Sequence, residues 1–191
     1  MFKLMIITVS TREGRKGGIF GEWIEAIAAR DPDWEIDAVD LMTLNLPMYD
    51  EPEHPRLGNY HNDYTKAWSA SVAAADAFIT VTPEYNFSAP PSIINALDYL
   101  AREWAYKPMA FVSYGGLSGG TRSVQMLKQV VTSLKIVPIF EAVTVPMFTS
   151  HIDAEGNLNP SPSMERSADA MLAELKKWAG PLSVMRAPAQ P

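Results

Sequence analysis

The feature that most constrains the fold is a regular alternation along the chain. Short apolar runs predict strands, and apolar residues at helical spacing predict the segments between them. The predicted strands are residues 2–9, 34–40, 76–82, 108–115 and 137–145. The run FKLMIITV at 2–9 is continuous, which is typical of a strand covered on both faces, as the strands of parallel sheets are. The alternation therefore indicates a parallel sheet with helical crossovers.

Five predicted helices separate or follow these strands. They cover residues 19–30, 62–74, 92–104, 119–134 and a final stretch that begins near 162, whereas residues 41–61 are irregular. Right-handed crossovers leave few topologies. We therefore expect an α/β fold: a flavodoxin-like three-layer α/β/α sandwich with a five-stranded parallel sheet of order 2-1-3-4-5. At this length we expect one domain, residues 1–180, followed by a disordered C-terminal tail, residues 181–191.

Composition excludes several classes of function. The chain has no cysteine, so disulfides, thiolate nucleophiles and Fe–S clusters are excluded, and its three histidines show no metal-binding spacing. A formal net charge of −6 disfavours nucleic acid as a partner. No apolar stretch approaches the roughly 20 residues needed to span a membrane. We expect a cytoplasmic protein with a small-molecule partner, no bound metal, and neither nucleic acid nor membrane as a partner.

The predicted topology places a ligand outside the carboxyl ends of the strands. The loops that reach this edge are residues 10–18, 83–89 and 114–120. The first loop, VSTREGRKGG, combines Ser10, Thr11, glycines and two arginines at the start of a helix. Bare amides, the helix dipole and arginine all favour an anion, so we predict a phosphate site there. The loop matches neither GxGxxG nor GxxxxGK[ST], which argues against dinucleotide-binding and P-loop folds.

The other two loops are suited to a flat, polar-edged ligand. In TPEYNFSAPP, Pro83 fixes the backbone, two rings are available and Asn86 tolerates unusual dihedral angles. In SYGGLSGGTR, four glycines let the main chain approach a ligand closely. We expect the two loops to place backbone groups against the edge of a heterocycle, and we interpret that heterocycle as a flavin.

The third loop also supports a rival interpretation. Residues 116–120 satisfy GxSxG, the nucleophile-elbow pattern of α/β-hydrolases, with Ser118 as the nucleophile. His151 lies downstream, and Asp153 or Glu141 could supply the acid. The elbow places its serine on a sharp turn directly off the strand, whereas here Tyr114, Gly115, Gly116 and Leu117 intervene, and Asp153 follows the histidine instead of preceding it. We keep a serine hydrolase as an alternative.

Three motifs taken together resemble one known family. STREGR, ADAFITVTPEYNFSAPPSIINALDYL and EWAYKPMAFVSYGGLSGGTR are similar to motifs of the NADPH-dependent FMN reductases, a flavodoxin-like group that includes quinone, azo-dye and chromate reductases. The resemblance covers roughly residues 2 to 146. It implies an FMN cofactor, NADPH or NADH as co-substrate, and a homodimer or a dimer of dimers.

The resemblance also assigns residues by position. It implies that Ser10, Arg12, Arg15 and Gly17 hold the FMN phosphate. The ring would be lined on one side by Pro83, Glu84, Tyr85 and Asn86, and at its other edge by Ser113, Tyr114, Gly115 and Gly116.

The resemblance implies that the chemistry belongs to FMN, which passes reducing equivalents from NAD(P)H to an acceptor such as FMN, a quinone, an azo compound or a metal oxyanion. No catalytic residue is therefore required. A flavodoxin-type electron carrier without its own NAD(P)H site remains an alternative. Tyr49, Tyr60 and Tyr64 could wall the open face of the flavin, in the same subunit or in a partner, or they could be ordinary core and surface cover. The helix at 92–104 is the expected dimer contact.

Overall fold

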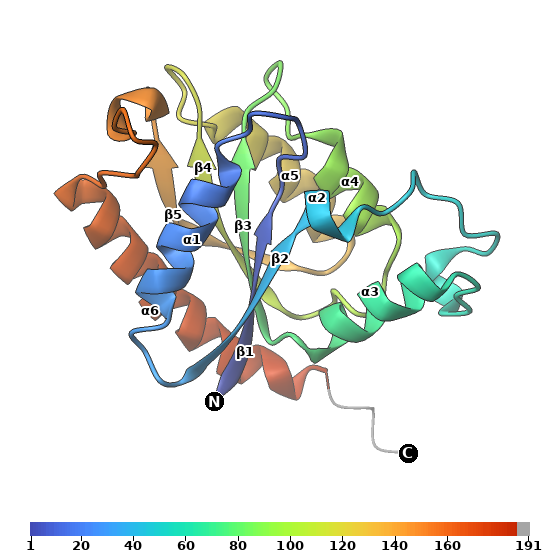
Figure 1. The fold of residues 1–191 in the computed structure, drawn as a ribbon. Coiled ribbons are helices and arrows are strands. Elements are labelled where there is room, and N and C mark those ends of the chain that lie inside the picture. Colours follow the sequence, from blue (N-terminus) through green and yellow to red (C-terminus); the bar gives the residue numbers. More distant parts are fainter. Residues whose placement is uncertain (187–191) are drawn as a thin grey trace.

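The structure, a computed structural model that describes residues 1–186, contains a five-stranded parallel sheet of order β2-β1-β3-β4-β5 (Figure 1). This confirms the expected α/β class and the flavodoxin-like strand order. The strands are β1 (Phe2–Thr8), β2 (Trp34–Asp40), β3 (Ala77–Pro83), β4 (Pro108–Tyr114) and β5 (Val137–Val145).

Helices cover both faces of the sheet, which gives the expected three layers (Figure 1). One face is covered by α1 (Gly17–Ala28) and α6 (Pro162–Val184). The other is covered by α3 (Asp63–Ala74), α4 (Pro91–Asp98) and α5 (Thr121–Ser133). Three short elements complete the chain: α2 (Leu41–Leu44), η1 (Pro55–Leu57) and η2 (Phe148–His151).

Each central strand divides its side chains between two apolar cores. In β1, Leu4 and Ile6 pack in the core beneath α1 and α6, whereas Met5 and Ile7 pack in the core beneath α3, α4 and α5. All seven residues of β3 and all seven of β4 are buried. Burial on both faces explains why these strands read as continuous apolar runs.

The fourth helix of the sequence analysis is shorter than predicted. α4 ends at Asp98, and residues 99–105 form turns instead of continuing the helix to 104. The apolar spacing still brings Trp104 into the core, where its indole N–H donates to the carbonyl of Leu97 at 3.2 Å. The periodicity therefore reported burial correctly but placed the helix end wrongly.

The C-terminal prediction was also partly wrong. α6 continues through Pro181 to Val184, so residues 181–184 are helical where we expected disorder. Tertiary contacts support this extension: Leu182 is buried, and Arg186 forms an ion pair with Asp76 at 2.9 Å. Residues 187–191, the rest of the predicted tail, lie outside the described part of the chain. Within residues 1–186, no helix combines the length and apolar character needed to cross a bilayer.

The irregular segment between β2 and α3 is anchored by buried hydrogen bonds. The Glu51 carboxylate, itself buried, accepts from the amides of His61 at 2.8 Å and Asn62 at 3.0 Å. Asp50 accepts from the hydroxyls of Tyr64 at 2.6 Å and Tyr99 at 3.0 Å. Residues 47–62 are therefore held against α3 and α4 although they contain only one short helical turn.

Candidate active site

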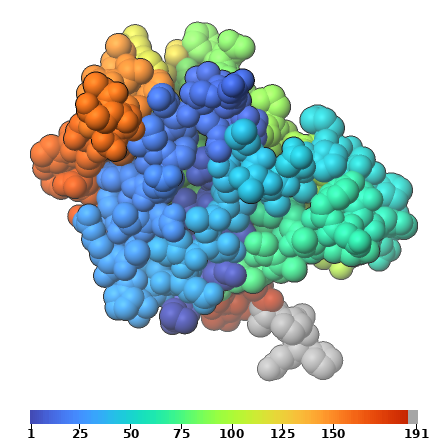
Figure 2. All heavy atoms as spheres, in the orientation of Figure 1, coloured from blue at the N-terminus to red at the C-terminus, as the bar shows by residue number. Residues whose placement is uncertain are grey.

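Three loops that are far apart in the sequence meet at the carboxyl edge of the sheet. They follow β1, β3 and β4 and lie together at the top of Figure 1, coloured dark blue, green and yellow-green. The same segments form the upper edge of the face drawn in Figure 2. We refer to residues 10–17, 84–89 and 115–120 as the rim loops. The structure thus brings together the three segments that the sequence analysis selected.

The start of α1 is suited to an anion. Its N-cap residue, Lys16, makes no side-chain capping bond, and no acidic residue lies in the first turn. The first-turn amides therefore lack the side-chain acceptor that usually satisfies them, and the helix dipole adds partial positive charge at the same place. This is the location predicted for the phosphate.

A buried hydroxyl lies at the same place. The Tyr114 side chain reaches from the end of β4 to the start of α1, where its oxygen would be 3.0 Å from a Cβ built on Gly17. Tyr114 is 3% exposed, and within residues 1–186 its hydroxyl has no hydrogen-bond partner. Burial raises its pKa, so the oxygen keeps its proton and is available as a donor. Its ring stacks on Phe20 at 4.6 Å, which fixes the direction of the hydroxyl.

The two arginines of the first loop are placed differently. Arg15 forms a two-pronged ion pair with Asp40, at 2.9 and 2.6 Å, and donates to the Ser10 carbonyl at 3.2 Å. It therefore joins the loop to the end of β2. Arg12 is exposed, and the contact found for its guanidinium is a long one of 3.5 Å to the Glu13 carbonyl. Arg12 is accordingly the arginine available to a ligand.

A hydrogen bond joins the first two rim loops. The hydroxyl oxygens of Ser10 and Tyr85 are 2.6 Å apart, and either can be the donor. Ser10 is buried, whereas Thr11, the next residue, is exposed and lines a hollow of about 540 Å³ between α2 and the start of α4. Two predicted cofactor residues from loops 75 positions apart are thus in direct contact.

The loop after β3 makes a tight two-residue turn. Tyr85 and Ser88 exchange backbone hydrogen bonds of 2.9 Å in both directions, and Asn86 and Phe87 between them have φ angles of 52° and 67°. These values are typical of a type I′ turn, in which asparagine is common and phenylalanine is not. The expectation that Asn86 tolerates an unusual backbone is confirmed.

Glu84 faces the protein, in contrast to the ligand-facing position implied by the sequence analysis. Its carboxylate accepts from the Ser118 hydroxyl at 2.7 Å, the Arg122 Nε at 2.6 Å and the Arg122 amide at 3.2 Å. Burial would raise the pKa of Glu84, but these hydrogen bonds outweigh burial and hold its pKa below the ordinary value. Glu84 therefore joins the loop after β3 to the loop after β4 and the start of α5.

The contact with Glu84 also bears on the hydrolase alternative. The Ser118 hydroxyl donates to a carboxylate, and within the described chain no hydrogen bond joins it to His151. A serine nucleophile needs a neighbouring base that can remove its proton, and a Glu84 carboxylate that is stabilised in its ionised form is a poor one. The arrangement gives no support to a serine hydrolase.

The glycines of the third loop are present for different structural reasons. Gly120 has a φ of 85°, and a Cβ there would come within 2.9 Å of the Tyr114 amide nitrogen. By contrast, a Cβ on Gly116 would meet no atom within 4 Å, and none of residues 1–186 accepts a hydrogen bond from its amide. Gly120 is required by the fold, whereas Gly116 presents main chain to open space. The Gly115 amide donates to the Val145 carbonyl at 3.2 Å.

Ser113 lies beneath the third rim loop and is not exposed at the rim. It is buried, and its Cβ would lie 2.9 Å from a Cβ on Gly120, toward the start of α5. Its hydroxyl has no partner within the described residues. Pro83 is the last residue of β3 and is buried, so it contributes to the base of the loop and not to its exposed surface.

Arg122 was missed as a functional candidate. It is the second residue of α5, and a cation at a helix N-terminus is disfavoured by the helix dipole. A basic residue in that position, two residues after the pair Gly119-Gly120, was a signal that a specific partner had to be present. That partner is Glu84.

The tyrosines of the segment between β2 and α3 have partners within the chain. The Tyr60 hydroxyl donates to Glu103 at 2.8 Å, Tyr64 donates to Asp50, and Tyr49 donates to the Glu53 carbonyl at 3.1 Å. Burial and the Glu103 hydrogen bond raise the pKa of Tyr60, and the Asp50 hydrogen bond raises the pKa of Tyr64 to about 12. These contacts favour the interpretation of structural cover.

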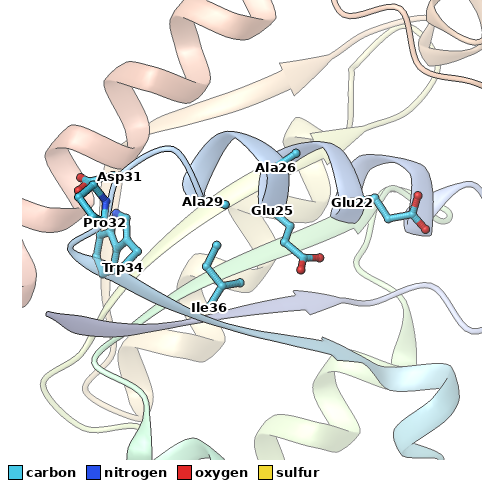
Figure 3. A pocket seen from close by; sticks show the side chains of 8 residues that line it. All are labelled: Glu22, Glu25, Ala26, Ala29, Asp31, Pro32, Trp34 and Ile36. Atoms are coloured by element: carbon cyan, nitrogen blue, oxygen red, sulfur yellow. The ribbon is translucent and has the colours of Figure 1, made fainter.

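Other hollows on the surface contain none of the predicted site residues. One of about 490 Å³ lies between α1 and β2, with Glu22 and Glu25 projecting from the helix and Trp34 and Ile36 from the strand (Figure 3). It is on the side of the sheet and lacks a basic residue. A larger one, of about 830 Å³, lies beside the end of α4. The candidate site is therefore the rim itself.

Comparisons with known proteins agree with this geometry. Residues 2–150 match the family described as NADPH-dependent FMN reductase. An NAD(P)H-dependent FMN reductase of Schizosaccharomyces pombe is 36% identical over 185 residues, which cover 95% of this chain and 88% of the relative. A quinone reductase of Escherichia coli is 30% identical over 139 residues, 69% of this chain and 71% of that one.

The structural comparison supports the same fold. The flavoenzyme NAD(P)H:(acceptor) oxidoreductase FerB of Paracoccus denitrificans superposes with a TM-score of 0.69 at 18% identity, covering 96% of this chain and 98% of its own. The family match begins in β1 and ends in η2, so it includes all three rim loops and excludes α6.

Proposed function

This chain belongs to the NADPH-dependent FMN reductase family and is an FMN-dependent NAD(P)H oxidoreductase, and from that premise we propose that its FMN is held by the three rim loops. When bound, FMN supplies the redox chemistry, accepting reducing equivalents from NAD(P)H and giving them to a second substrate. The protein binds and orients its ligands and controls access of water.

The phosphate end of FMN fits the start of α1. The donors offered there are the first-turn amides from Gly17 onward, the hydroxyls of Ser10 and Thr11, the hydroxyl of Tyr114 and the guanidinium of Arg12. Amide, hydroxyl and guanidinium groups are the donors that a phosphate dianion accepts from. The buried Tyr114 hydroxyl is the observation that carries this assignment, because a polar atom buried without a partner costs free energy unless a ligand satisfies it.

Arg15 contributes to this site through position. It holds the Ser10 carbonyl and the Asp40 carboxylate together, and Asp40 also accepts from the Met42 amide at 2.9 Å. The loop after β1 is thereby fixed to the end of β2 and the start of α2. We assign Arg15 to the shape of the phosphate loop and Arg12 to the charge that faces the phosphate.

The ring of FMN fits the two loops on the other side of the rim. Within residues 1–186, the amides of Asn86 and Gly116 donate to no other atom, so each is free to donate to the polar edge of a heterocycle. Glu84 keeps the spacing of the two loops through Ser118 and Arg122.

The direct test is the absorbance spectrum of the purified protein. We expect a yellow protein that releases FMN on denaturation, and an apoprotein that regains the spectrum on titration with FMN. Steady consumption of NADPH with a quinone would identify a reductase, whereas bound FMN without turnover would indicate a flavodoxin-type carrier. A colourless protein that does not bind added FMN would contradict the proposed site.

We also propose a cytoplasmic homodimer, which assembles further into a dimer of dimers if a second surface is used. The support is the resemblance to the family together with the exposed apolar side chains of Met42 and Met48, which line a hollow beside α4. Burying such side chains between subunits would stabilise association. Sedimentation at micromolar concentration tests this, and a monomer would contradict it. Cell fractionation tests the location.

A further inference from the structure

Phe87 combines two properties that are costly for a phenylalanine. It is 68% exposed and has a φ of 67°, in the second central position of the turn that starts at Tyr85. Glycine or asparagine adopts this conformation at lower cost, and left-handed non-glycine residues concentrate at functional sites. The backbone conformation gives no reason for a large aromatic ring at this position.

The ring is also held in place. The Arg122 guanidinium carbon lies 3.9 Å from the centroid of the Phe87 ring, a stacked cation–π contact. Arg122 is itself fixed by the buried Glu84 carboxylate, at 2.6 Å from Nε. One face of the ring therefore rests on a guanidinium that cannot rotate freely, while the exposed area leaves the ring open on its other side.

Two more exposed apolar side chains extend this surface along the rim. Leu117, in the loop after β4, is 90% exposed, and Met147, just after β5, is 57% exposed. The Met147 amide donates to the Gly116 carbonyl at 2.8 Å, and Ser118 bonds to Glu84, so these segments are connected to one another and to the turn of Phe87. The green, yellow-green and orange loops lie next to one another in Figure 1. Large apolar side chains on three successive loops indicate a binding surface.

Resting on the proposed function, we propose that this surface is the acceptor site and that Phe87 stacks on the ring of a flat aromatic acceptor, a quinone. Glu84 and Arg122 are positioning residues that hold the Phe87 ring in a stacking orientation. In the overall reaction, NAD(P)H is oxidised to NAD(P)⁺ and the quinone is reduced to the hydroquinone. The two electrons and one proton come from NAD(P)H and the second proton comes from solvent.

The test separates the two half-reactions in Phe87→Ala. Reduction of the bound FMN by NADPH under anaerobic conditions should keep its wild-type rate, and FMN content should be unchanged. The KM for a naphthoquinone should rise about tenfold with a smaller change in kcat, because stacking contributes to binding. The KM for ferricyanide, which has no aromatic ring, should change by less than about twofold. Phe87→Trp should restore a low KM for the naphthoquinone.

The chain provides a matched control in Phe140. It is 90% exposed on β5, five residues before the end of that strand and away from the rim. Phe140→Ala removes the same side chain from the surface, so all rates and the KM for both acceptors should stay at wild-type values. Arg122→Ala should raise the KM for the naphthoquinone in the same direction as Phe87→Ala, and Arg122→Ala in the Phe87→Ala background should add little further change.

The outcomes are distinguishable from failure of the proposed function. Normal FMN content and reduction with an unchanged KM for the naphthoquinone in Phe87→Ala would overturn the acceptor site alone. Loss of FMN in that variant would assign Phe87 to cofactor binding, and a smaller sedimenting species would assign it to a subunit contact; either result overturns the proposal. A wild-type protein without FMN would overturn the proposed function as well.

Discussion

The two ends of β4 treat their buried polar groups in opposite ways. At the amino end, before β4, Lys107 is buried but donates to the carbonyls of Val72 at 2.6 Å and Ala73 at 3.0 Å, which satisfies the end of α3. At the carboxyl end of the same strand, Tyr114 is equally buried, and its hydroxyl has no partner within residues 1–186. At the amino end of β4 the buried amine is satisfied within the fold, whereas at the carboxyl end a buried hydroxyl is left without a protein partner in the described residues.

The difference follows from the topology. In an open parallel sheet the loops after the strands diverge at the switch point, here between β1 and β3, which leaves room outside their carboxyl ends. At the amino end, by contrast, the chain enters each strand after β1 from the side of a helix that packs on the sheet. A substitution at the rim should therefore alter ligand binding, whereas one at the amino end should alter folding alone.

The largest effect should come from adding a methyl group to Gly120, beneath the third rim loop. In Gly120→Ala, the Cβ would lie within 2.9 Å of the Tyr114 amide at a φ of 85°, so we expect a loss of about 4 kcal/mol in unfolding free energy together with loss of FMN binding. Gly156→Ala is the control, since Gly156 has a φ of 92° but no atom within 4 Å. It should cost about 1 kcal/mol, from backbone strain alone, and leave FMN binding intact. Chemical denaturation measures the unfolding free energy of each variant, and FMN titration measures its binding. Equal losses of unfolding free energy in Gly120→Ala and Gly156→Ala would contradict the clash described at Gly120.

The buried lysine at the amino end of β4 should make the unfolding free energy depend on pH. Burial lowers the pKa of Lys107 to about 8 from 10.5. Between these two values the unfolded chain binds more protons at this residue than the folded chain does, so its contribution to the unfolding free energy rises with pH. The penalty for burying the charge is fully present below pH 8 and is lost as pH rises toward 10.5.

The measurement is the unfolding free energy of the wild type minus that of Lys107→Met, followed across this window. The difference should rise by about 3 kcal/mol between the two pKa values, with no matching change in the Kd for FMN. A difference that stays flat with pH would show that Lys107 is not buried as described.

A smaller effect should separate binding from stability at the rim. Tyr114→Phe removes a buried hydroxyl without a partner, so the apoprotein should become more stable by about 1 kcal/mol. The Kd for FMN should rise about tenfold, because a donor to the phosphate is lost. Riboflavin, which lacks the phosphate, should bind both proteins equally. If Tyr114→Phe bound FMN and riboflavin as the wild type does, the hydroxyl would have no role in phosphate binding.

The smallest effect should distinguish the two arginines of the first loop. Arg12→Ala should weaken FMN binding about fivefold at low salt and less at high salt, with no change in stability, because the guanidinium is exposed. Arg15→Ala should lower the midpoint of thermal unfolding, because it breaks the ion pair with Asp40. Titrations with FMN and riboflavin at two salt concentrations measure the affinity of each variant. Thermal unfolding measures its stability. Identical behaviour of the two variants would contradict their separate assignments.

Much of the fold could be predicted from the sequence because buried segments have a recognisable local pattern of apolar residues. Strands covered on both faces, such as β3 and β4, are apolar without interruption, and this pattern placed them within one or two residues. The helix ends were less predictable. α4 stops where Trp104 turns back to the Leu97 carbonyl, and α6 continues through Pro181 because Arg186 reaches Asp76. Both causes are tertiary contacts, which periodicity does not report.

The meeting of the three loops that form the candidate site was predictable, and the direction of their side chains was less so. The topology rule selected the three loops, and the structure brings Ser10 into contact with Tyr85 and leaves the Gly116 amide without a partner within the described residues. The direction of each side chain was not readable. Glu84 faces Arg122, 38 positions away, and Arg15 faces Asp40, 25 positions away. A charged residue in a binding loop can serve the ligand or the loop, and composition alone does not distinguish the two.

The contacts between the rim loops have a consequence for how fast and how tightly a cofactor binds. Ser10 with Tyr85 and Glu84 with Ser118 fix the spacing of three segments through protein atoms alone. A cofactor that enters such a frame loses its own translational freedom but orders little polypeptide. Association should therefore proceed in a single kinetic phase whose rate grows linearly with cofactor concentration, without the plateau that a slow rearrangement of the polypeptide would impose.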